Sequence, residues 1–201
     1  MRVVGGRHRG RTLAAPAGRD VRPTADRTRE ALFNRLAHAG FGPGGLSILT
    51  DAIVLDAFCG TGALALEALS RGAGAATLMD RDSIALACAR ANAATLGEEA
   101  LCRFLRADAT APPPNPGAAA TLVLLDPPYA SGTGPSALAS LAAEGWVAPA
   151  AICALELSSK DEAPAAPDGF ERLDARRYGA AQIVLFRHHG VRSVPGAASR
   201  L

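Results

Sequence analysis

Residues 53–62, Ile53-Val54-Leu55-Asp56-Ala57-Phe58-Cys59-Gly60-Thr61-Gly62, decide the fold of this chain. The first six form a short apolar run that predicts a buried strand, and Gly60-Thr61-Gly62 predicts a tight turn. The apolar residues 63–71 then predict a helix that Gly72 ends. A strand, a glycine turn and a helix in this order begin a βαβ unit. The segment therefore indicates an α/β protein with a parallel sheet.

The same alternation continues towards the C-terminus. Short apolar runs predict further strands, and longer stretches between them predict helices. Residues 170–178 and 181–187 flank Gly179 and predict a closing hairpin that adds an antiparallel strand at one edge. We therefore expect a doubly wound, mostly parallel sheet. The further strands are expected at 75–80, 102–106, 121–125 and 151–157, and the further helices at 82–96 and 135–141.

A smaller extension precedes the sheet. Residues 2–13 predict two short strands around a glycine-rich basic turn, and Pro23 with Thr24 as cap predicts a helix that ends at Gly40. The chain thus divides into an N-terminal hairpin and helix, a linker, a main domain and a disordered tail. These parts are residues 1–40, 41–50, 51–189 and 190–201.

Composition narrows the class of protein. Hydrophobic residues make up 49% and charged residues 20% of 201 residues, which is typical of a globular chain with a real core. No apolar run approaches the ~20 residues of a membrane span. The four cysteines form no C-x-x-C pair, which favours reduced thiols in a cytoplasmic protein without zinc. The adjacent His188 and His189 point to opposite faces of a strand, so we expect solvated side chains and no metal site.

Charge is distributed unevenly along the chain. The net charge is +2, but residues 1–35 contain nine arginines against three acids, a local balance of +6. Arginine side chains suit phosphate oxygens, so the extension is predicted to meet a polyanion. A solvated charged loop is the alternative. No exposed apolar stripe or heptad repeat predicts a partner subunit, and a monomer is expected.

The sequence Asp126-Pro127-Pro128-Tyr129 closes the apolar run 121–125. Neither proline donates a ladder hydrogen bond, so the strand stops there and leaves a carboxylate, free carbonyls and an aromatic face. In an open α/β sheet, ligands bind at the carboxyl ends of the strands. A plain turn explains the prolines equally well.

Two cofactors fit this pattern. Gly60, Gly62 and Ala65 match the loose dinucleotide pattern G-x-G-x-x-G/A, which keeps an NAD-dependent oxidoreductase in consideration. However, Asp56 ends the strand before the glycines, where it disfavours an anionic pyrophosphate and favours the ammonium and sulfonium of S-adenosylmethionine. Acids also end the next strands, at Asp80 and Asp108.

The turn at Asp126 suits methyl transfer to an amine. The exocyclic amine of a nucleobase is a poor nucleophile because its lone pair is delocalised into the ring. Hydrogen bonds to the Asp126 carboxylate and the Pro127 carbonyl would favour a tetrahedral nitrogen and stabilise its developing positive charge. Stacking of the base on Tyr129 would contribute ~1–3 kcal/mol. The same chemistry serves guanine N2, adenine N6 and cytosine N4, so a DNA adenine-N6 or cytosine-N4 methyltransferase remains an alternative.

The chain resembles the bacterial 16S ribosomal RNA guanine-N2 methyltransferases of the RsmD type over about residues 2–187. The motifs that carry the resemblance are Arg2-Val3-Val4-Gly5-Gly6, Arg9-Gly10-Arg11, Arg22-Pro23-Thr24, Asp26-Arg27-Thr28-Arg29-Glu30, Leu55–Leu64, Glu67–Ala73 and Asp126-Pro127-Pro128-Tyr129. The resemblance implies a class I S-adenosylmethionine-dependent methyltransferase with a Rossmann-like seven-stranded sheet. The implied substrate is 16S rRNA in the small ribosomal subunit or its assembly intermediate.

The resemblance also implies residue roles. The catalytic residues would be Asp126, Pro127, Pro128 and Tyr129, and the cofactor-binding residues would be Asp56, Phe58, Gly60, Gly62, Asp80, Arg81, Asp108 and Ala109. The RNA-binding residues would be Arg7, Arg9, Arg11, Arg22, Thr24, Arg27 and Arg29. Asp80, the expected ribose ligand, stands where the family usually has Glu, so its side chain is one methylene shorter.

Overall fold

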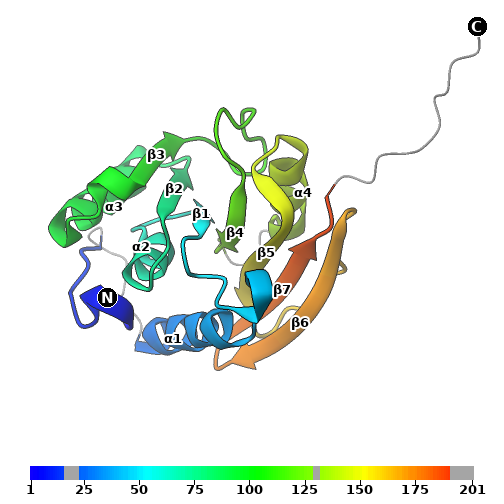
Figure 1. Cartoon of the computed structure of the whole chain (residues 1–201), viewed down its shortest axis with the longest axis horizontal. Coiled ribbons are helices and arrows are strands. Elements are labelled where there is room, and N and C mark those ends of the chain that lie inside the picture. Colours follow the sequence, from blue (N-terminus) through cyan, green and yellow to red (C-terminus); the bar gives the residue numbers. More distant parts are fainter. Residues whose placement is uncertain (16–22, 129–131, 191–201) are drawn as a thin grey trace, which may run out of the picture.

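The computed structural model describes residues 1–15, 23–128 and 132–190, with side chains of the first helix described from Asp26 onward (Figure 1). The strands are β1 (Ile53–Ala57), β2 (Ala75–Asp80), β3 (Cys102–Arg106), β4 (Ala120–Leu125), β5 (Val147–Ser158), β6 (Phe170–Tyr178) and β7 (Ala181–His188). The helices are α1 (Pro23–His38), α2 (Ala63–Ser70), α3 (Ser83–Leu96) and α4 (Gly134–Ala143). The 3-10 turns within the described ranges are η1 (Gly6–His8), η2 (Pro43–Gly45) and η3 (Glu99–Leu101).

The strands form one sheet in the order β3-β2-β1-β4-β5-β7-β6. All neighbouring pairs are parallel except β5–β7 and β6–β7. The order reverses between β1 and β4, and this is where an open sheet offers a crevice for ligands. The predicted α/β fold is confirmed.

The closing hairpin differs from the prediction in one respect. The antiparallel strand is β7, which lies between β5 and β6, so β6 and not β7 forms the edge. The difference in burial between β6 and β7 explains why β6 forms the edge. Nearly every residue of β7 is buried, whereas β6 is mostly exposed between Glu171 and Arg177. The more apolar strand of the hairpin takes the inner position because it has a neighbour on both sides.

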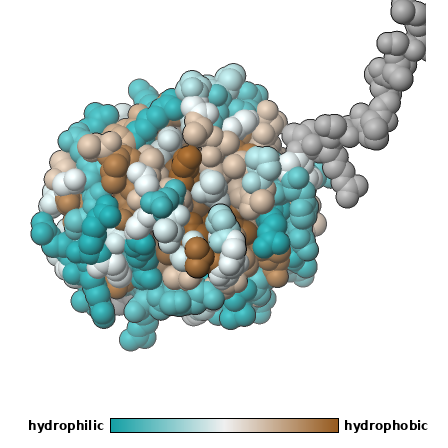
Figure 2. All heavy atoms as spheres, viewed as in Figure 1, coloured by the Kyte–Doolittle hydropathy of each residue, from teal (hydrophilic) through white to brown (hydrophobic). Residues whose placement is uncertain are grey.

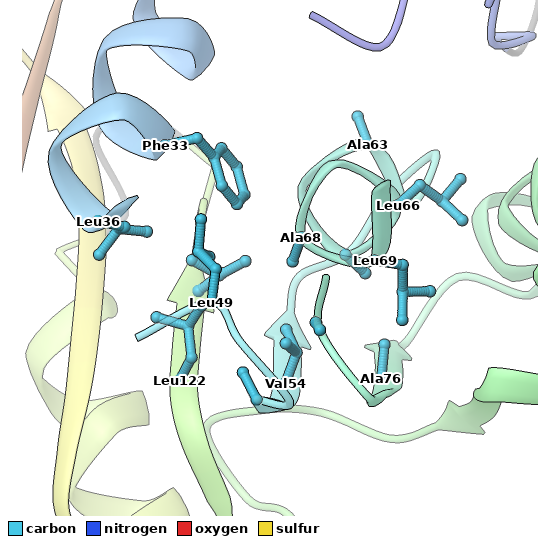
Figure 3. Packing of buried hydrophobic residues seen from close by; sticks show 14 of the residues in the cluster. Phe33, Leu36, Leu49, Val54, Ala63, Leu66, Ala68, Leu69, Ala76 and Leu122 are labelled. Atoms are coloured by element: carbon cyan, nitrogen blue, oxygen red, sulfur yellow. The ribbon is translucent and has the colours of Figure 1, made fainter. Parts of the chain in front are cut away.

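Helices cover both faces of the sheet. Residues of α1, α2 and α3 pack in one apolar cluster against one face, and α4 packs in a second cluster against the other. Figure 3 shows Phe33 and Leu36 of α1 turned towards the layer that holds Leu49, Val54 and Leu122. The α3 helix begins where the Asp82 carboxylate accepts a hydrogen bond from Ile84 N at 2.8 Å, and it ends at Gly97 with a left-handed φ of 74°.

The N-terminal segment departs from the expected pair of strands. One isolated antiparallel bridge joins Arg2 and Thr12, and η1 replaces the expected turn between two strands. The reason is close packing at Gly6, where φ is +73° and a Cβ atom would lie 2.0 Å from the Ser70 carbonyl oxygen. The backbone therefore bends onto α2 instead of extending.

Within the segment 42–50, Ile48 and Leu49 are buried in the same cluster as α1 and α2, whereas residues 43–46 are exposed. One further expectation is corrected by burial. His188 is buried, not solvated: it stacks on Phe170 and its Nδ1 lies 3.0 Å from the Ala148 carbonyl oxygen. The division into domains at residues 40 and 50 stays a prediction.

Polar side chains cover most of the face in Figure 2, with apolar patches scattered between them. Among the described residues, no helix has the length and apolar character needed to cross a membrane.

Candidate active site

The glycine turn between β1 and α2 is tightly constrained. Phe58 has a left-handed φ of 67°, a conformation that costs a non-glycine residue free energy and that clusters at functional sites. Gly60 and Gly62 also have positive φ, and a Cβ atom on Gly62 would lie 2.8 Å from Leu78 Cδ2. These positions let the turn pass close over β1 and β2. They place Phe58, Gly60 and Gly62 together at the carboxyl end of β1.

Asp56 lies beneath this turn and is fully buried. Its Oδ2 accepts a hydrogen bond from Ala65 N at 2.9 Å, while its Oδ1 is buried without a hydrogen-bond partner among the described residues. Burial raises the pKa of Asp56 to about 7, against the effect of the Ala65 hydrogen bond, and the charge of Asp80 adds to the rise. A buried carboxylate with an unpaired oxygen is costly unless a ligand donates to it.

Two other acids follow the neighbouring strands. Asp80 binds the turn itself: its Oδ2 accepts from Gly60 N and its Oδ1 from Asp82 N, both at 2.9 Å. Asp108 accepts from Thr110 N at 2.9 Å and Thr110 Oγ1 at 2.7 Å, and these bonds lower its pKa. Thus Asp80 already holds the glycine turn, and its predicted contact with ribose stays a prediction. Arg81 is exposed beside this edge, and Ala109 is buried after Asp108.

The Asp126-Pro127-Pro128 turn follows β4 on the neighbouring strand to β1 (Figure 1). Pro127 is buried, whereas Asp126 and Pro128 are exposed, and Tyr129 lies outside the described residues. Nearby protein atoms reduce the hydration of the Asp126 carboxylate despite this exposure. Together with the charges of Glu156 and Asp56, they raise its pKa. A cavity of about 300 Å³ opens beside Pro127 and Pro128.

This edge fits the methionine end of S-adenosylmethionine. That end carries an ammonium group and a sulfonium, and this edge carries two carboxylates, Asp126 and Asp56, of which the Asp56 Oδ1 has no partner in the part of the chain that is described. A cation there would lower both raised pKa values and offset the burial of Asp56. An anionic dinucleotide would instead meet like charge. Among the described residues, no cluster of His, Cys, Asp or Glu side chains is arranged to hold a metal ion.

The tip of the N-terminal segment, which carries Arg7, Arg9 and Arg11, does not lie with the catalytic turn. The tip of the N-terminal segment packs on Ser70, where His8 N donates to Ser70 Oγ at 2.9 Å. Ser70 ends α2, and the following turn joins the amino end of β1 through a bond from Asp51 N to the Gly72 carbonyl oxygen. The tip therefore lies at the amino edge of the sheet, opposite the carboxyl edge that carries Asp126.

The arginines of this region have different environments. Arg9, Arg11 and Arg27 are exposed, and Arg9 and Arg27 line a cavity of about 370 Å³. Arg7 donates two 2.7 Å hydrogen bonds to Glu98. Arg29 is buried and donates to the Arg2 carbonyl oxygen and, at 2.7 Å, to Asp26 Oδ1. Its guanidinium thus ties the N-terminal segment to α1. Arg22 and the Thr24 side chain lie outside the described residues.

Sequence reasoning missed several polar residues. Glu67 is fully buried and accepts from Arg71 Nε at 2.7 Å and Val4 N at 2.8 Å. Asn92 donates to the Thr61 and Ala14 carbonyl oxygens, both at 3.0 Å, and so joins the N-terminal segment to the glycine turn. Glu156 stands beside Asp126. Glu156 directly follows the apolar run Ala151–Leu155, and this position near the end of a predicted strand could have identified it as a candidate site residue.

Solved structures establish the class of protein. A putative methyltransferase from Escherichia coli matches with a TM-score of 0.78 and 31% identity, and a putative methylase from Haemophilus influenzae with 0.72 and 26%. Each match covers 94% of this chain and 98% of the other. The fold and the site define a class I methyltransferase.

The family follows from the sequence. The profile of the family described as conserved hypothetical protein 95 matches residues 1–187, and the chain belongs to this family. The protein named ribosomal RNA small subunit methyltransferase D in Escherichia coli strain K12 is 36% identical over 167 residues, which are 83% of this chain and 79% of that protein. The predicted membership of the RsmD type is confirmed, and the NAD-dependent alternative is not supported.

Proposed function

We propose that this enzyme transfers a methyl group from S-adenosylmethionine to the exocyclic N2 of a guanine in 16S rRNA, within the small ribosomal subunit or its assembly intermediate. The observation that carries the proposal is the turn at Asp126 near Asp56, whose buried Oδ1 has no hydrogen-bond partner among the described residues. The relative named for small-subunit ribosomal RNA supports the choice of RNA over DNA. The cytoplasm, where small subunits assemble, is the corresponding location.

The residues of the turn would activate the amine. The Asp126 carboxylate and the Pro127 carbonyl would accept its two N–H groups, so that the nitrogen lone pair is released from the ring and aimed across the crevice. S-adenosylmethionine would supply a methyl carbon bonded to a sulfonium, whose C–S bond breaks as the new N–C bond forms. Asp126 would stabilise the positive charge on the nitrogen, S-adenosylhomocysteine would be the leaving group, and the extra proton on the nitrogen would pass to solvent water. Asp56 would hold the ammonium end, and Asp80 would keep the glycine turn in place.

The RNA is proposed to contact two edges of the protein. Arg9, Arg11 and Arg27 are exposed around the N-terminal segment, whereas the target base must reach the carboxyl edge. Phosphate contacts fix the position of a nucleic acid without reading its sequence. We therefore assign these arginines to the backbone of an RNA element distinct from the one that carries the target guanine.

Mass spectrometry of digested 16S rRNA tests the proposal. RNA from a strain that lacks the enzyme should lose one N2-methylguanosine, and the purified enzyme with S-adenosylmethionine should restore it to small subunits. Calorimetry should also detect binding of S-adenosylhomocysteine but not of NADH. Restoration of methylated adenine or cytosine instead would reject guanine N2 as the target.

A further inference from the structure

The cavity beside the catalytic turn is acidic. Besides Pro127 and Pro128, its lining includes Glu156, Asp161 and Glu162, and no Lys, Arg or His lines it in the described part of the chain. Three carboxylates repel phosphate, so this cavity does not suit the RNA backbone. It suits a neutral group that presents N–H donors, as the edge of an extruded base does.

Glu156 is the carboxylate of this set that is fixed by the sheet. The β4–β5 register pairs Leu125 with Leu155, so the residues that follow, Asp126 and Glu156, lie side by side at the carboxyl edge. The other side of β5 pairs Glu156 with Ile183 of β7. The backbone of Glu156 is therefore held by β7, and that of the preceding Leu155 by both β4 and β7. Its charge is one of those that act on Asp126, which places the two carboxylates close together.

The bases differ at the atom beside the reactive amine. In guanine the N2 amine is flanked by N1–H, a donor, so the edge presents adjacent donors. In adenine and cytosine the ring nitrogen that flanks the amine on the Watson–Crick edge is an acceptor. A second carboxylate next to the one that binds the amine thus attracts guanine, whereas it faces a lone pair in adenine or cytosine. A carboxylate that faces the lone pair of a ring nitrogen disfavours adenine and cytosine strongly, because both groups have lost water and neither gains a hydrogen bond.

We propose that Glu156 selects guanine by accepting its N1–H, while Asp126 and the Pro127 carbonyl accept the hydrogens of N2. This inference rests on the proposed function, and it assigns the base specificity to one residue of β5. Asp161 and Glu162 add negative potential at the mouth of the cavity and exclude phosphate.

A base analogue tests the assignment. Once the modified guanine is mapped, splinted ligation places 2,6-diaminopurine at that position; this base keeps the 2-amine but has an acceptor at N1. The wild-type enzyme should methylate guanine roughly 10- to 100-fold faster than the analogue. Glu156→Gln should reduce that ratio at least about tenfold, because the amide N–H can donate to N1 of diaminopurine. The ratio of the binding affinities of the two RNAs, measured in the presence of S-adenosylhomocysteine, should also fall in Glu156→Gln.

Two controls separate the possible failures. Glu99→Gln neutralises an exposed carboxylate in η3, remote from the cavity, and should leave the ratio unchanged. The ratio is measured within one protein preparation, so it does not depend on the fraction that is folded. If Glu156→Gln lowers methylation of both bases equally, the assignment of Glu156 is wrong while the proposed function stands. If the wild-type enzyme does not methylate guanine N2 at all, both proposals are rejected.

Discussion

Buried carboxylates at the two edges of the sheet have opposite environments. At the amino edge, Glu98 accepts hydrogen bonds from Arg7 and His8, and the bonds from Arg7 are the main cause of its lowered pKa. Glu67, at the same edge, accepts a hydrogen bond from Arg71. At the carboxyl edge, Asp56 is equally buried, yet one of its oxygens has no partner among the described residues and its pKa is raised to about 7. The chain contains enough arginine to pair an acid at this edge as well.

The difference separates structural acids from functional ones. A buried acid with an arginine holds two segments of the chain together, as Glu67 and Glu98 hold the N-terminal segment to α2 and α3. A buried acid without a cation carries a cost in the free protein that a positively charged ligand removes. Four substitutions test this contrast, and they are given in decreasing order of the change that we expect.

Replacement of Asp126 should have the largest effect, and it should act on catalysis. Asp126→Ala removes the carboxylate that stabilises the attacking amine, so we expect turnover to fall about 10²- to 10³-fold in single-turnover assays. Asp126→Asn, which keeps an acceptor oxygen, should lose less. Binding of S-adenosylmethionine, followed by calorimetry, should be largely retained. Turnover of Asp126→Ala at the wild-type rate would show that the turn does not activate the amine.

Replacement of Glu67 should affect folding. Glu67→Gln leaves Arg71 without its charged partner, and it removes the second of the two carboxylates beside the buried Arg29, whose Nε lies 3.8 Å from Glu67. Breaking a buried pair in this way should lower the free energy of unfolding by about 3 kcal/mol, measured by urea denaturation. Glu99→Gln, on the surface, serves as the control. A loss no larger than the control's would mean that the pairing at the amino edge contributes little.

Replacement of Asp56 should raise the free energy of unfolding of the ligand-free protein, whereas replacement of Glu67 lowers it. The raised pKa means that the folded state binds a proton more tightly than the unfolded state, so Asp56 lowers stability increasingly as pH rises from about 4 to about 7. Asp56→Asn should therefore raise the free energy of unfolding at pH 8 by about 2 kcal/mol and weaken S-adenosylmethionine binding. The gain should disappear at pH 4. A variant that is less stable than the wild type at pH 8 would contradict the contrast between the edges.

Replacement of Glu98 should have the smallest effect, with the reverse pH dependence. Its lowered pKa stabilises the fold above the ordinary pKa of glutamate, and this contribution is lost as pH falls through the folded-state value. Because Arg7 is partly exposed, Glu98→Gln should cost only about 1 kcal/mol at pH 7. Thermal unfolding should show that the wild type and the variant converge at acid pH. Equal separation at pH 3 and pH 7 would rule out the Arg7 and His8 pairing as the cause.

Local pattern was sufficient for most of the fold. The strands at 75–80, 102–106 and 170–178 have the predicted bounds, because their apolar residues are flanked by turn residues and acids. The path of residues 2–13 could not be predicted in the same way. It depends on the close approach of Gly6 to Ser70, which is 64 residues away in the sequence. Likewise, the burial of His188 depends on Phe170 and Ala148, both brought in by other strands.

Local sequence was sufficient to predict the class of sheet, the glycine turn, and the acids at the ends of β1, β2 and β4, since each depends on neighbouring residues and on the periodicity of strands and helices. Which of the acids are paired depends instead on the three-dimensional fold. The fold placed Arg7 on Glu98 and Arg29 beside Glu67, and it left Asp56 buried with an oxygen that has no partner within residues 1–15, 23–128 and 132–190. It also set Glu156 beside Asp126 and separated the basic tip from the catalytic turn. The physical reason is that ion pairing and desolvation depend on distances in space between residues that are far apart in the chain.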